Sequence, residues 1–260
     1  MVPIIVLCGQ AGSGKSTLGT YLSYNHGATC IALADPIKRI CQYVFEFTDE
    51  QLWGPSQLRG EVDKRDPKNI EKLLDQKTIW SDPGLYGVLP PAYNPTFARS
   101  CFSDWAEGCF LKTKEGLTPR YCLQTLGTEW GRAIDPNLWI KIGLDTATKL
   151  LEDPSLIYIP SKGIQKRDPE IREWKTGGIV ITDGRFRNEI LEVKKVGGIA
   201  VDLRRGGLPK LPKTHPSETE LEGIPLHWFD YVIFNNYDMR ELHSKADSLI
   251  SKVWHPGEAL

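Results

Sequence analysis

A glycine-rich segment near the start of the chain constrains the fold more than any other feature. Gly9, Gly14, Lys15 and Ser16 match the pattern G-x-x-x-x-G-K-[ST], which requires a tight turn between a buried strand and a helix. The preceding residues, 2–8, form a continuous apolar run rich in β-branched side chains, as expected of a strand covered on both faces. The sequence therefore predicts an α/β fold that begins with a strand, this turn and a helix.

The same segment predicts the binding of a polyphosphate. Gly12 and Gly14 allow successive N–H groups to turn inward, and the start of the helix adds a partial positive charge. Lys15 is placed to neutralise the β- and γ-phosphates of a nucleoside triphosphate, and the Ser16 hydroxyl to ligate Mg²⁺. The residues expected to contact the nucleotide are Gly9, Gly12, Ser13, Gly14, Lys15, Ser16 and Thr17.

Length and composition are those of an ordinary globular enzyme. The chain has 260 residues, of which 25% are charged, and its formal net charge is −1. No polyelectrolyte-binding surface is implied, which favours small ligands over nucleic acid. The six cysteines show no C-x-x-C pair and no zinc spacing with histidine, so reduced thiols are expected. No membrane partner is expected, because the first apolar run is too short for a membrane span and lacks a basic leader. We therefore expect a cytoplasmic protein.

Short apolar runs recur along the chain with helical material between them, as in a parallel sheet built from βαβ units. The predicted strands are residues 4–8, 30–34, 179–182, 199–203 and 231–234. Asp35, Asp183 and Asn235 follow three of these runs, at the carboxyl edge where ligands bind in open α/β sheets.

The middle of the chain breaks this pattern. It carries six of the eight tryptophans and two predicted helices, near residues 120–134 and 138–151. We expect residues 36–175 to form a substrate-binding insertion rather than an independent domain, with the core made of residues 1–35 and 176–260. A second irregular segment, about 204–228, is polar and rich in Pro and Gly, and predicts either a lid or a plain surface loop.

Two classes of phosphate-binding protein are disfavoured. A GTPase needs D-x-x-G and N-K-x-D motifs, but no Asp stands three residues before a Gly, and residues 235–238 lack the lysine. A mechanical ATPase usually has an acidic pair where this chain has Asp183 followed by Arg185 and Arg187. Cations at this position suit an enzyme that holds a second anionic substrate.

A polar ridge is predicted along the helix near residues 120–134. Its side chains recur every four residues: Arg120, Gln124, Thr128 and Arg132. Gln can pair with a base edge and Arg can form a fork with a phosphate, although a solvated face fits the spacing equally well. Gly127 lies inside this helix at a cost of about 1 kcal/mol relative to Ala, so we expect it to permit a close approach.

Six blocks of sequence resemble the phage-type deoxynucleoside monophosphate kinases, which have the P-loop nucleoside monophosphate kinase fold. In chain order they are ALADPIK (32–38), TPRYCLQTLGTEWGR (118–132), DPNLW (135–139), ITDGRFRNE (181–189), HPSE (215–218) and DYVIFN (230–235). The resemblance extends over most of the chain and is weakest from about residue 45 to 117.

The resemblance implies roles for residues that match the family's motifs. Asp35 would face the reacting phosphates with Lys38 close by, and the implied catalytic residues are Lys15, Asp35, Asp183 and Arg185. Ser16 and Asp183 would hold Mg²⁺. The implied substrate-binding residues are Lys38, Arg120, Gln124, Thr128, Arg132, Trp139, Arg187 and Glu189.

Some of these roles have structural alternatives. Trp139 could be a wall of the substrate pocket or a core tryptophan, and Glu189 could belong to a DxRxxxE cluster or serve as a structural helix cap or ion-pair partner. The family commonly has an apolar residue and a proline where this chain has Gly184 and Arg187, so which arginine meets the phosphate is open. Cations of the predicted lid are either phosphate ligands or solvated charges: Arg204, Arg205, Lys210 and Lys213.

Together these features predict a three-layer α/β P-loop kinase with a central parallel sheet of about five strands, the insertion and a lid. The expected reaction moves the γ-phosphoryl group of ATP to a deoxynucleoside 5′-monophosphate, giving ADP and the diphosphate for DNA synthesis. The alternatives are a kinase for another small metabolite, such as dephospho-coenzyme A, or a P-loop ATP-binding or ATPase module. A homodimer is compatible with the sequence, which marks no interface.

Overall fold

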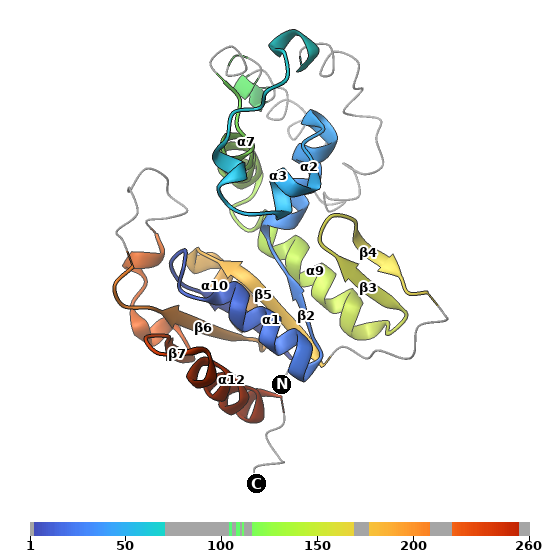
Figure 1. The fold of residues 1–260 in the computed structure, drawn as a ribbon. Coiled ribbons are helices and arrows are strands. Elements are labelled where there is room, and N and C mark those ends of the chain that lie inside the picture. Colours follow the sequence, from blue (N-terminus) through green and yellow to red (C-terminus); the bar gives the residue numbers. More distant parts are fainter. Residues whose placement is uncertain are drawn as a thin grey trace. The chain divides into compact units, whose positions relative to one another are not determined.

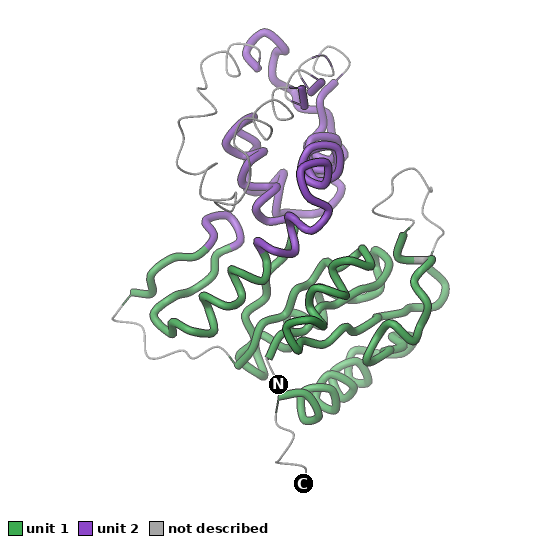
Figure 2. Tube along the Cα trace, turned by 180° about the vertical axis from the view of Figure 1, so that it is seen from behind, with its two compact units in different colours: residues 1–33, 143–159, 164–260 green, residues 34–142, 160–163 purple. Residues whose placement is uncertain are grey.

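The computed structural model describes residues 3–70, 104–105, 108–109, 111, 116–168, 177–208 and 220–254. The chain divides into two compact units, unit 1 with residues 1–33, 143–159 and 164–260, and unit 2 with residues 34–142 and 160–163 (Figure 2). The sequence assigns residues 36–175 to the insertion, whereas residues 143–159 and 164–168 group with the core. The substrate-binding role of the insertion stays a prediction.

Unit 1 is built on a five-stranded sheet in the order β2-β5-β1-β6-β7, with each neighbouring pair parallel (Figure 1). Its strands are β1 (Ile4–Cys8), β2 (Ala28–Ile31), β5 (Gly178–Gly184), β6 (Ile199–Arg204) and β7 (Tyr231–Phe234). Strand β1 is central and buried throughout, with Ile5 opposite Val180 on one side and Ile199 on the other. This burial explains the continuous apolar run in the sequence.

Helices cover both faces of the sheet. Ile5 and Leu7 share one apolar cluster with residues of α1 (Lys15–His26) and α12 (Met239–Val253). Helix α10 (Arg187–Lys195) covers the opposite face (Figure 1). The predicted fold class, a three-layer α/β structure with a parallel sheet of about five strands, is therefore confirmed.

The second predicted strand is displaced. Strand β2 ends at Ile31 rather than at residue 34, and Asp35 lies in the first turn of α2 (Ala34–Phe45). Pro36 suits the start of a helix, because its missing N–H needs no partner in the first turn. The apolar run continues through Leu33 without marking this change, so Asp35 is not the residue that ends the strand.

A two-stranded sheet, which belongs to unit 1 except for its residue Gly163, was not anticipated from the sequence. It consists of β3 (Leu156–Ile159) and β4 (Gly163–Lys166), and Gly163 has a φ of +75°. A short β-branched run followed by Pro, Ser, Lys and Gly is a recognisable signal for a strand and a turn.

Unit 2 is helical in its described part. Its elements are α2, α3 (Asp49–Trp53), the 3-10 helix η1 (Leu58–Gly60), α7 (Pro119–Thr125), the π-helix η2 (Leu126–Gly131), α8 (Arg132–Ile134) and the start of α9 (Leu138–Glu152). Both predicted helices of the middle segment are present. Two further 3-10 helices, η3 (Leu221–Gly223) and η4 (Leu226–Trp228), belong to unit 1.

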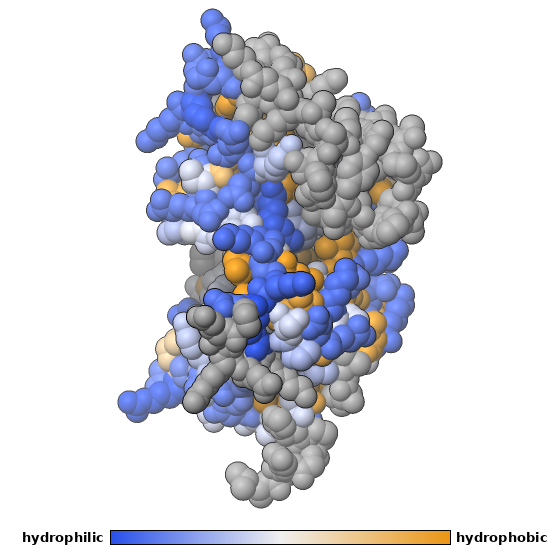
Figure 3. Space-filling model, turned by 90° about the vertical axis from the view of Figure 1, so that its right-hand side faces the viewer, coloured by the Kyte–Doolittle hydropathy of each residue, from blue (hydrophilic) through white to orange (hydrophobic). Residues whose placement is uncertain are grey.

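The described surface is mostly hydrophilic in the view of Figure 3. Large apolar side chains that are more than half exposed include Tyr24 and Tyr237. Among the described residues, none of the helices combines the length and apolarity needed to cross a membrane.

Candidate active site

The glycine-rich turn of unit 1 has the backbone geometry of an anion cradle. Gly9, Gly12 and Gly14 have φ values of +138°, +82° and +104°, which residues other than glycine rarely adopt. A Cβ atom on Gly9 would lie 2.3 Å from the carbonyl oxygen of Leu203. The turn therefore packs directly against β6, and only glycine fits at this point.

The turn leads into a helix N-terminus that is open to a ligand. Gly14 is the N-cap of α1, no side chain caps the helix there, and its first turn contains no acidic residue. The first N–H groups of a helix lack intrahelical acceptors, and they favour an anion. These features fit the phosphates of a nucleotide.

Lys15 spans the turn. Its ammonium group donates hydrogen bonds to the carbonyl oxygens of Gly9, at 2.6 Å, and Gln10, at 2.9 Å. Burial, and to a smaller extent the positive charge of Arg185, lower the pKa of Lys15 to about 8 despite the opposing effect of Asp183 and other acidic groups. A bound phosphate would add negative charge beside this partly buried ammonium group.

Ser13 adds a second sign of a polar ligand. Its side chain is fully buried, and its hydroxyl oxygen has no hydrogen-bond partner within the described part of the chain. Buried hydroxyl groups are usually paired, so an unpaired one in a phosphate-binding turn fits a site shaped for a bound group.

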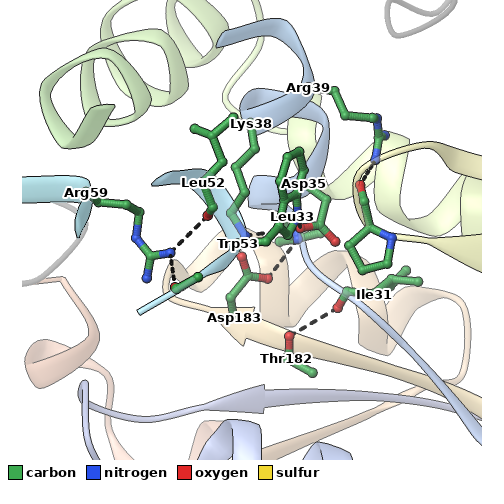
Figure 4. A network of polar contacts seen from close by, with 12 residues as sticks. Ile31, Leu33, Asp35, Lys38, Arg39, Leu52, Trp53, Arg59, Thr182 and Asp183 are labelled. Carbon is green, nitrogen blue, oxygen red and sulfur yellow. Dashed lines mark hydrogen bonds and ion pairs between the residues drawn. The ribbon is translucent and has the colours of Figure 1, made fainter. Parts of the chain in front are cut away.

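Asp183 lies at the carboxyl end of the sheet and is held there by the segment that follows β2. Its Oδ1 accepts a hydrogen bond from the main-chain N–H of Leu33 at 2.7 Å, and the Thr182 hydroxyl donates to the carbonyl of Ile31 at 3.3 Å (Figure 4). The Ser16 residue is exposed at the start of α1. Both side chains offer the hard oxygen ligands that Mg²⁺ prefers.

No group of three or more His, Cys, Asp or Glu side chains within the described ranges could hold a metal ion. Mg²⁺ commonly takes one or two protein oxygens and completes its shell with water and substrate phosphates. The donor set of Ser16 and Asp183 therefore fits a metal that arrives with a nucleotide.

The predicted site residues that follow Asp183 in the chain are Arg185, Arg187 and Glu189, and their surroundings differ. The Glu189 carboxylate is buried and accepts hydrogen bonds from the main-chain N–H groups of Arg185, at 2.7 Å, and Phe186, at 3.0 Å. It thus has the geometry of the helix cap that the sequence left as an alternative, while its substrate role stays a prediction. Arg185 itself is exposed.

Arg187 is turned to a neighbouring segment of unit 1. Its guanidinium donates to the carbonyl oxygen of Gly223 at 2.6 Å and lies 5.8 Å from the ring centre of Trp228. Arg204 is paired with the buried Asp202, with 2.6 Å between Nε and Oδ2. The other predicted lid cations are either exposed, as Arg205 is, or lie outside the described residues, as do Lys210, Lys213 and the HPSE block.

In unit 2, Asp35 is buried within a polar cluster. Its Oδ1 accepts a hydrogen bond from the indole N–H of Trp53 at 2.9 Å. The same oxygen forms an ion pair with the ammonium group of Lys38 at 3.2 Å (Figure 4). The Lys38 ammonium also lies 5.5 Å from the centre of the Trp53 ring. The structure therefore brings Asp35 and Lys38 together and adds Trp53, which the sequence did not single out.

The predicted polar ridge is altered by the π-helix η2. Arg120 and Gln124 lie in α7, before it, whereas Thr128 lies within it and Arg132 after it. A π-helix widens the turn to i→i+5 hydrogen bonds, so a spacing of four residues no longer keeps side chains in one row. The single straight ridge expected of an α-helix is wrong, while the binding role of each residue stays a prediction. Arg120 is exposed and donates to the carbonyl of Ser56 at 2.9 Å.

Trp139 has the surroundings of a core residue. It is 4% exposed, and its indole N–H donates to the carbonyl oxygen of Gly127 at 2.7 Å. A Cβ atom on Gly131 would lie 2.3 Å from its ring. The alternative that the sequence left open, a core tryptophan, matches this geometry, and the role of a pocket wall stays a prediction.

Comparisons with known proteins extend along nearly the whole chain. No protein-family model matches it. It is 26% identical over 250 residues to a protein of Acanthamoeba polyphaga mimivirus named "Putative deoxynucleotide monophosphate kinase", covering 96% of this chain and 97% of the relative. It is 23% identical over 257 residues to "Deoxynucleotide monophosphate kinase" of Escherichia phage RB69, covering 95% and 99%. The chain is thus similar, over nearly all of its residues, to two proteins named as deoxynucleotide monophosphate kinases. The resemblance predicted from six sequence blocks is confirmed.

Two side chains that support the predicted site were missed as functional residues. They are Trp53, which contacts Asp35, and Asn235, whose side-chain amide donates to the carbonyl of Ser13 at 2.9 Å. The position of Asn235 after a predicted strand was a usable signal. Trp53 lies where the sequence resemblance is weakest, and its contact joins residues 18 apart along the chain.

Proposed function

We propose that the protein transfers the γ-phosphoryl group of ATP to a deoxynucleoside 5′-monophosphate, giving ADP and the diphosphate for DNA synthesis. The observation that carries the proposal is the similarity to two named kinases over at least 95% of this chain. The phosphate-binding geometry of unit 1 supports it, because such a kinase must hold a triphosphate.

The donor nucleotide is assigned to the turn of unit 1. Its phosphates accept hydrogen bonds from the main chain of residues 9–17, and the charge of Lys15 offsets theirs. Ser16 and Asp183 would hold Mg²⁺, which when bound neutralises and orients the β- and γ-phosphates. Arg185, exposed after β5, adds a second positive charge for the transferred group.

The acceptor nucleotide is assigned to residues of unit 2. Arg120 would bind its phosphate and Gln124 its base edge, because a guanidinium can form a fork with phosphate oxygens and a carboxamide can both donate and accept. Thr128, Arg132 and the pair of Asp35 and Lys38 complete the proposed set.

The chemistry requires positioning more than a strong base. The attacking atom is an oxygen of a phosphate that is already anionic near neutral pH, so these residues need not remove a proton from it. Their work is to hold two anionic substrates and to spread the charge of the transferred group, for which the cations at positions 15 and 185 are suited.

The proposal is tested by measuring ADP formation from ATP and Mg²⁺ with each deoxynucleoside monophosphate, each ribonucleotide counterpart and dephospho-coenzyme A added separately. We expect stimulation by one or more deoxynucleotides and little ATP loss without an acceptor. Lys15→Ala should abolish the stimulation, whereas Lys149→Ala, which removes an exposed lysine paired with Asp145 one helix turn away, should not. Hydrolysis of ATP without an acceptor, or transfer only to dephospho-coenzyme A, would overturn the proposal in favour of the corresponding alternative.

A homodimer and a cytoplasmic location stay predictions. The molecular mass in solution, measured by light scattering on the full chain, tests the first.

A further inference from the structure

We propose that Asn235 is a positioning residue that orients the peptide group between Ser13 and Gly14 for phosphate binding. This inference rests on the proposed function, because it assigns a further residue to the same nucleotide site. Asn235 was expected only as a polar residue at the sheet edge, and no nucleotide contact is required of it here.

The main chain of Asn235 is fixed by the sheet. It follows β7 directly, and its N–H donates to the carbonyl oxygen of Arg204, at the end of β6, at 2.7 Å. Its side-chain Nδ2 then donates to the carbonyl oxygen of Ser13 at 2.9 Å. Asn235 therefore ties the phosphate-binding turn to a rigid strand end more than two hundred residues away in the chain.

This hydrogen bond determines where the next N–H points. A trans peptide group is planar, and its C=O and N–H bonds point in opposite directions. Because the Ser13 carbonyl is held toward Asn235, the N–H of Gly14 must point away from Asn235. We assign this N–H to the donors that face the bound phosphate.

The packing around Gly14 supports the same arrangement. A Cβ atom on Gly14 would lie 2.5 Å from Nδ2 of Asn235 and 3.6 Å from its Cγ. The amide of Asn235 therefore occupies the space beside Gly14, whose φ of +104° belongs to a left-handed conformation. A carboxylate at position 235 could not donate to the Ser13 carbonyl and would place two acceptor oxygens side by side.

The neighbouring Asn236 offers a matched control. Its side-chain Oδ1 accepts a hydrogen bond from the N–H of Gly206 at 2.7 Å, so Asn236→Asp keeps the acceptor that the structure uses. It adds the same negative charge one residue away. Comparing Asn235→Asp with Asn236→Asp thus separates the lost donor from the added charge.

The experiment measures the Kd of the full chain for ADP with Mg²⁺ by calorimetry, without an acceptor, alongside the melting temperature. We expect Asn235→Asp to weaken ADP binding about tenfold or more, as for a lost hydrogen bond with an acceptor left unpaired. Asn235→Ala should weaken it less, because water can replace the donor, and Asn236→Asp should change it less than about twofold.

A second measurement separates positioning from a loss of folding. In amide NMR spectra, the Gly14 N–H signal of the parent and of Asn236→Asp should shift on ADP binding, and that of Asn235→Asp should shift little. Equal ADP affinities and equal Gly14 shifts in all variants would overturn the inference and leave the proposed function standing. A parent protein that binds no ADP would overturn both.

Discussion

The phosphate-binding turn of unit 1 and the polar helix of unit 2 are built in different ways. In the turn, the proposed ligands are mainly main-chain N–H groups, and their directions follow from the left-handed glycines at positions 9, 12 and 14. In unit 2, they are side chains whose positions depend on distant contacts, as Arg120 depends on the carbonyl of Ser56. The comparison teaches that a site made from backbone conformation can be read from a short motif, whereas a site made from side chains cannot.

Gly14→Ala should have the largest effect. The added Cβ would lie 2.5 Å from the Asn235 amide at a φ that L residues rarely adopt, so the turn must rearrange. We expect kcat/KM to fall about 100-fold or more, comparable to the loss of a preorganised donor in other enzymes. Initial rates at varied ATP, on variants shown to be folded by circular dichroism, check this. A loss below tenfold would mean that backbone conformation matters less in unit 1 than the comparison holds.

Arg120→Ala should act on the acceptor alone. We expect the KM for the deoxynucleotide to rise about tenfold while the KM for ATP stays unchanged, because a phosphate ligand of one substrate is removed. Arg39→Ala is the matched control, since Arg39 is another arginine of unit 2 that donates to a main-chain carbonyl, that of Pro160 at 2.8 Å. An unaltered acceptor KM in Arg120→Ala, or an equal rise in Arg39→Ala, would remove Arg120 from the proposed set.

The lowered pKa of Lys15 predicts a pH dependence specific to unit 1. Burial reduces the pKa of this lysine to about 8, and the charge of a bound phosphate should raise it toward its ordinary value. Above about pH 8, nucleotide binding must therefore take up a proton, and affinity should fall several-fold between about pH 7 and 9. Calorimetry of ADP binding at about pH 9 in buffers of different ionisation enthalpy measures the uptake.

Lys15→Arg serves as the control for this measurement of proton uptake, because a guanidinium group stays protonated between about pH 7 and 9. Its nucleotide binding, even if weaker, should take up no proton at position 15. The same uptake in both proteins would assign the proton to another group and remove the link between burial of Lys15 and phosphate binding.

The difference between the two units also explains what could be predicted from the sequence. The five parallel strands and the turn were predictable because central strands are continuous apolar runs and the glycines have a backbone role. The end of β2 was not, since Leu33 continues the apolar run into a region that is no longer strand. The β3 and β4 pair was missed although its turn residues were visible, because the segment was treated as part of the insertion.

In unit 2, local patterns gave the helices but not the arrangement of their side chains. The four-residue spacing from Arg120 to Arg132 assumed an α-helix, and nothing in that spacing indicates the π-helix at residues 126–131. The contact of Trp53 with Asp35 depends on two helices packing together, which sequence periodicity does not specify. The roles of Glu189 and Trp139 were left open for the same reason.

Gly127→Ala should have the smallest effect. It tests whether the proposed site of unit 2 is independent of backbone space at a glycine. Gly127 lies in the π-helix without a positive φ, and the one contact of an added Cβ within 4 Å, among the described residues, would be with the Cδ1 of Ile37 at 3.1 Å. The end of that side chain can shift by a few tenths of an ångström, and alanine recovers up to about 1 kcal/mol of helix propensity. We therefore expect the free energy of unfolding to change by less than about 1 kcal/mol.

Gly131→Ala is the matched control for that substitution, four residues along the same helix. Its Cβ would lie 2.3 Å from the Trp139 ring, which is buried and has little room to move, so we expect a clear loss of stability of about 1–3 kcal/mol. Urea unfolding of both variants measures the difference. If Gly127→Ala kept its stability but lost acceptor binding, then the close approach that this glycine permits would be that of the substrate rather than that of Ile37. Unit 2 would in that case also contain a site that depends on backbone space, and the contrast between the two units would be weaker than the structure indicates.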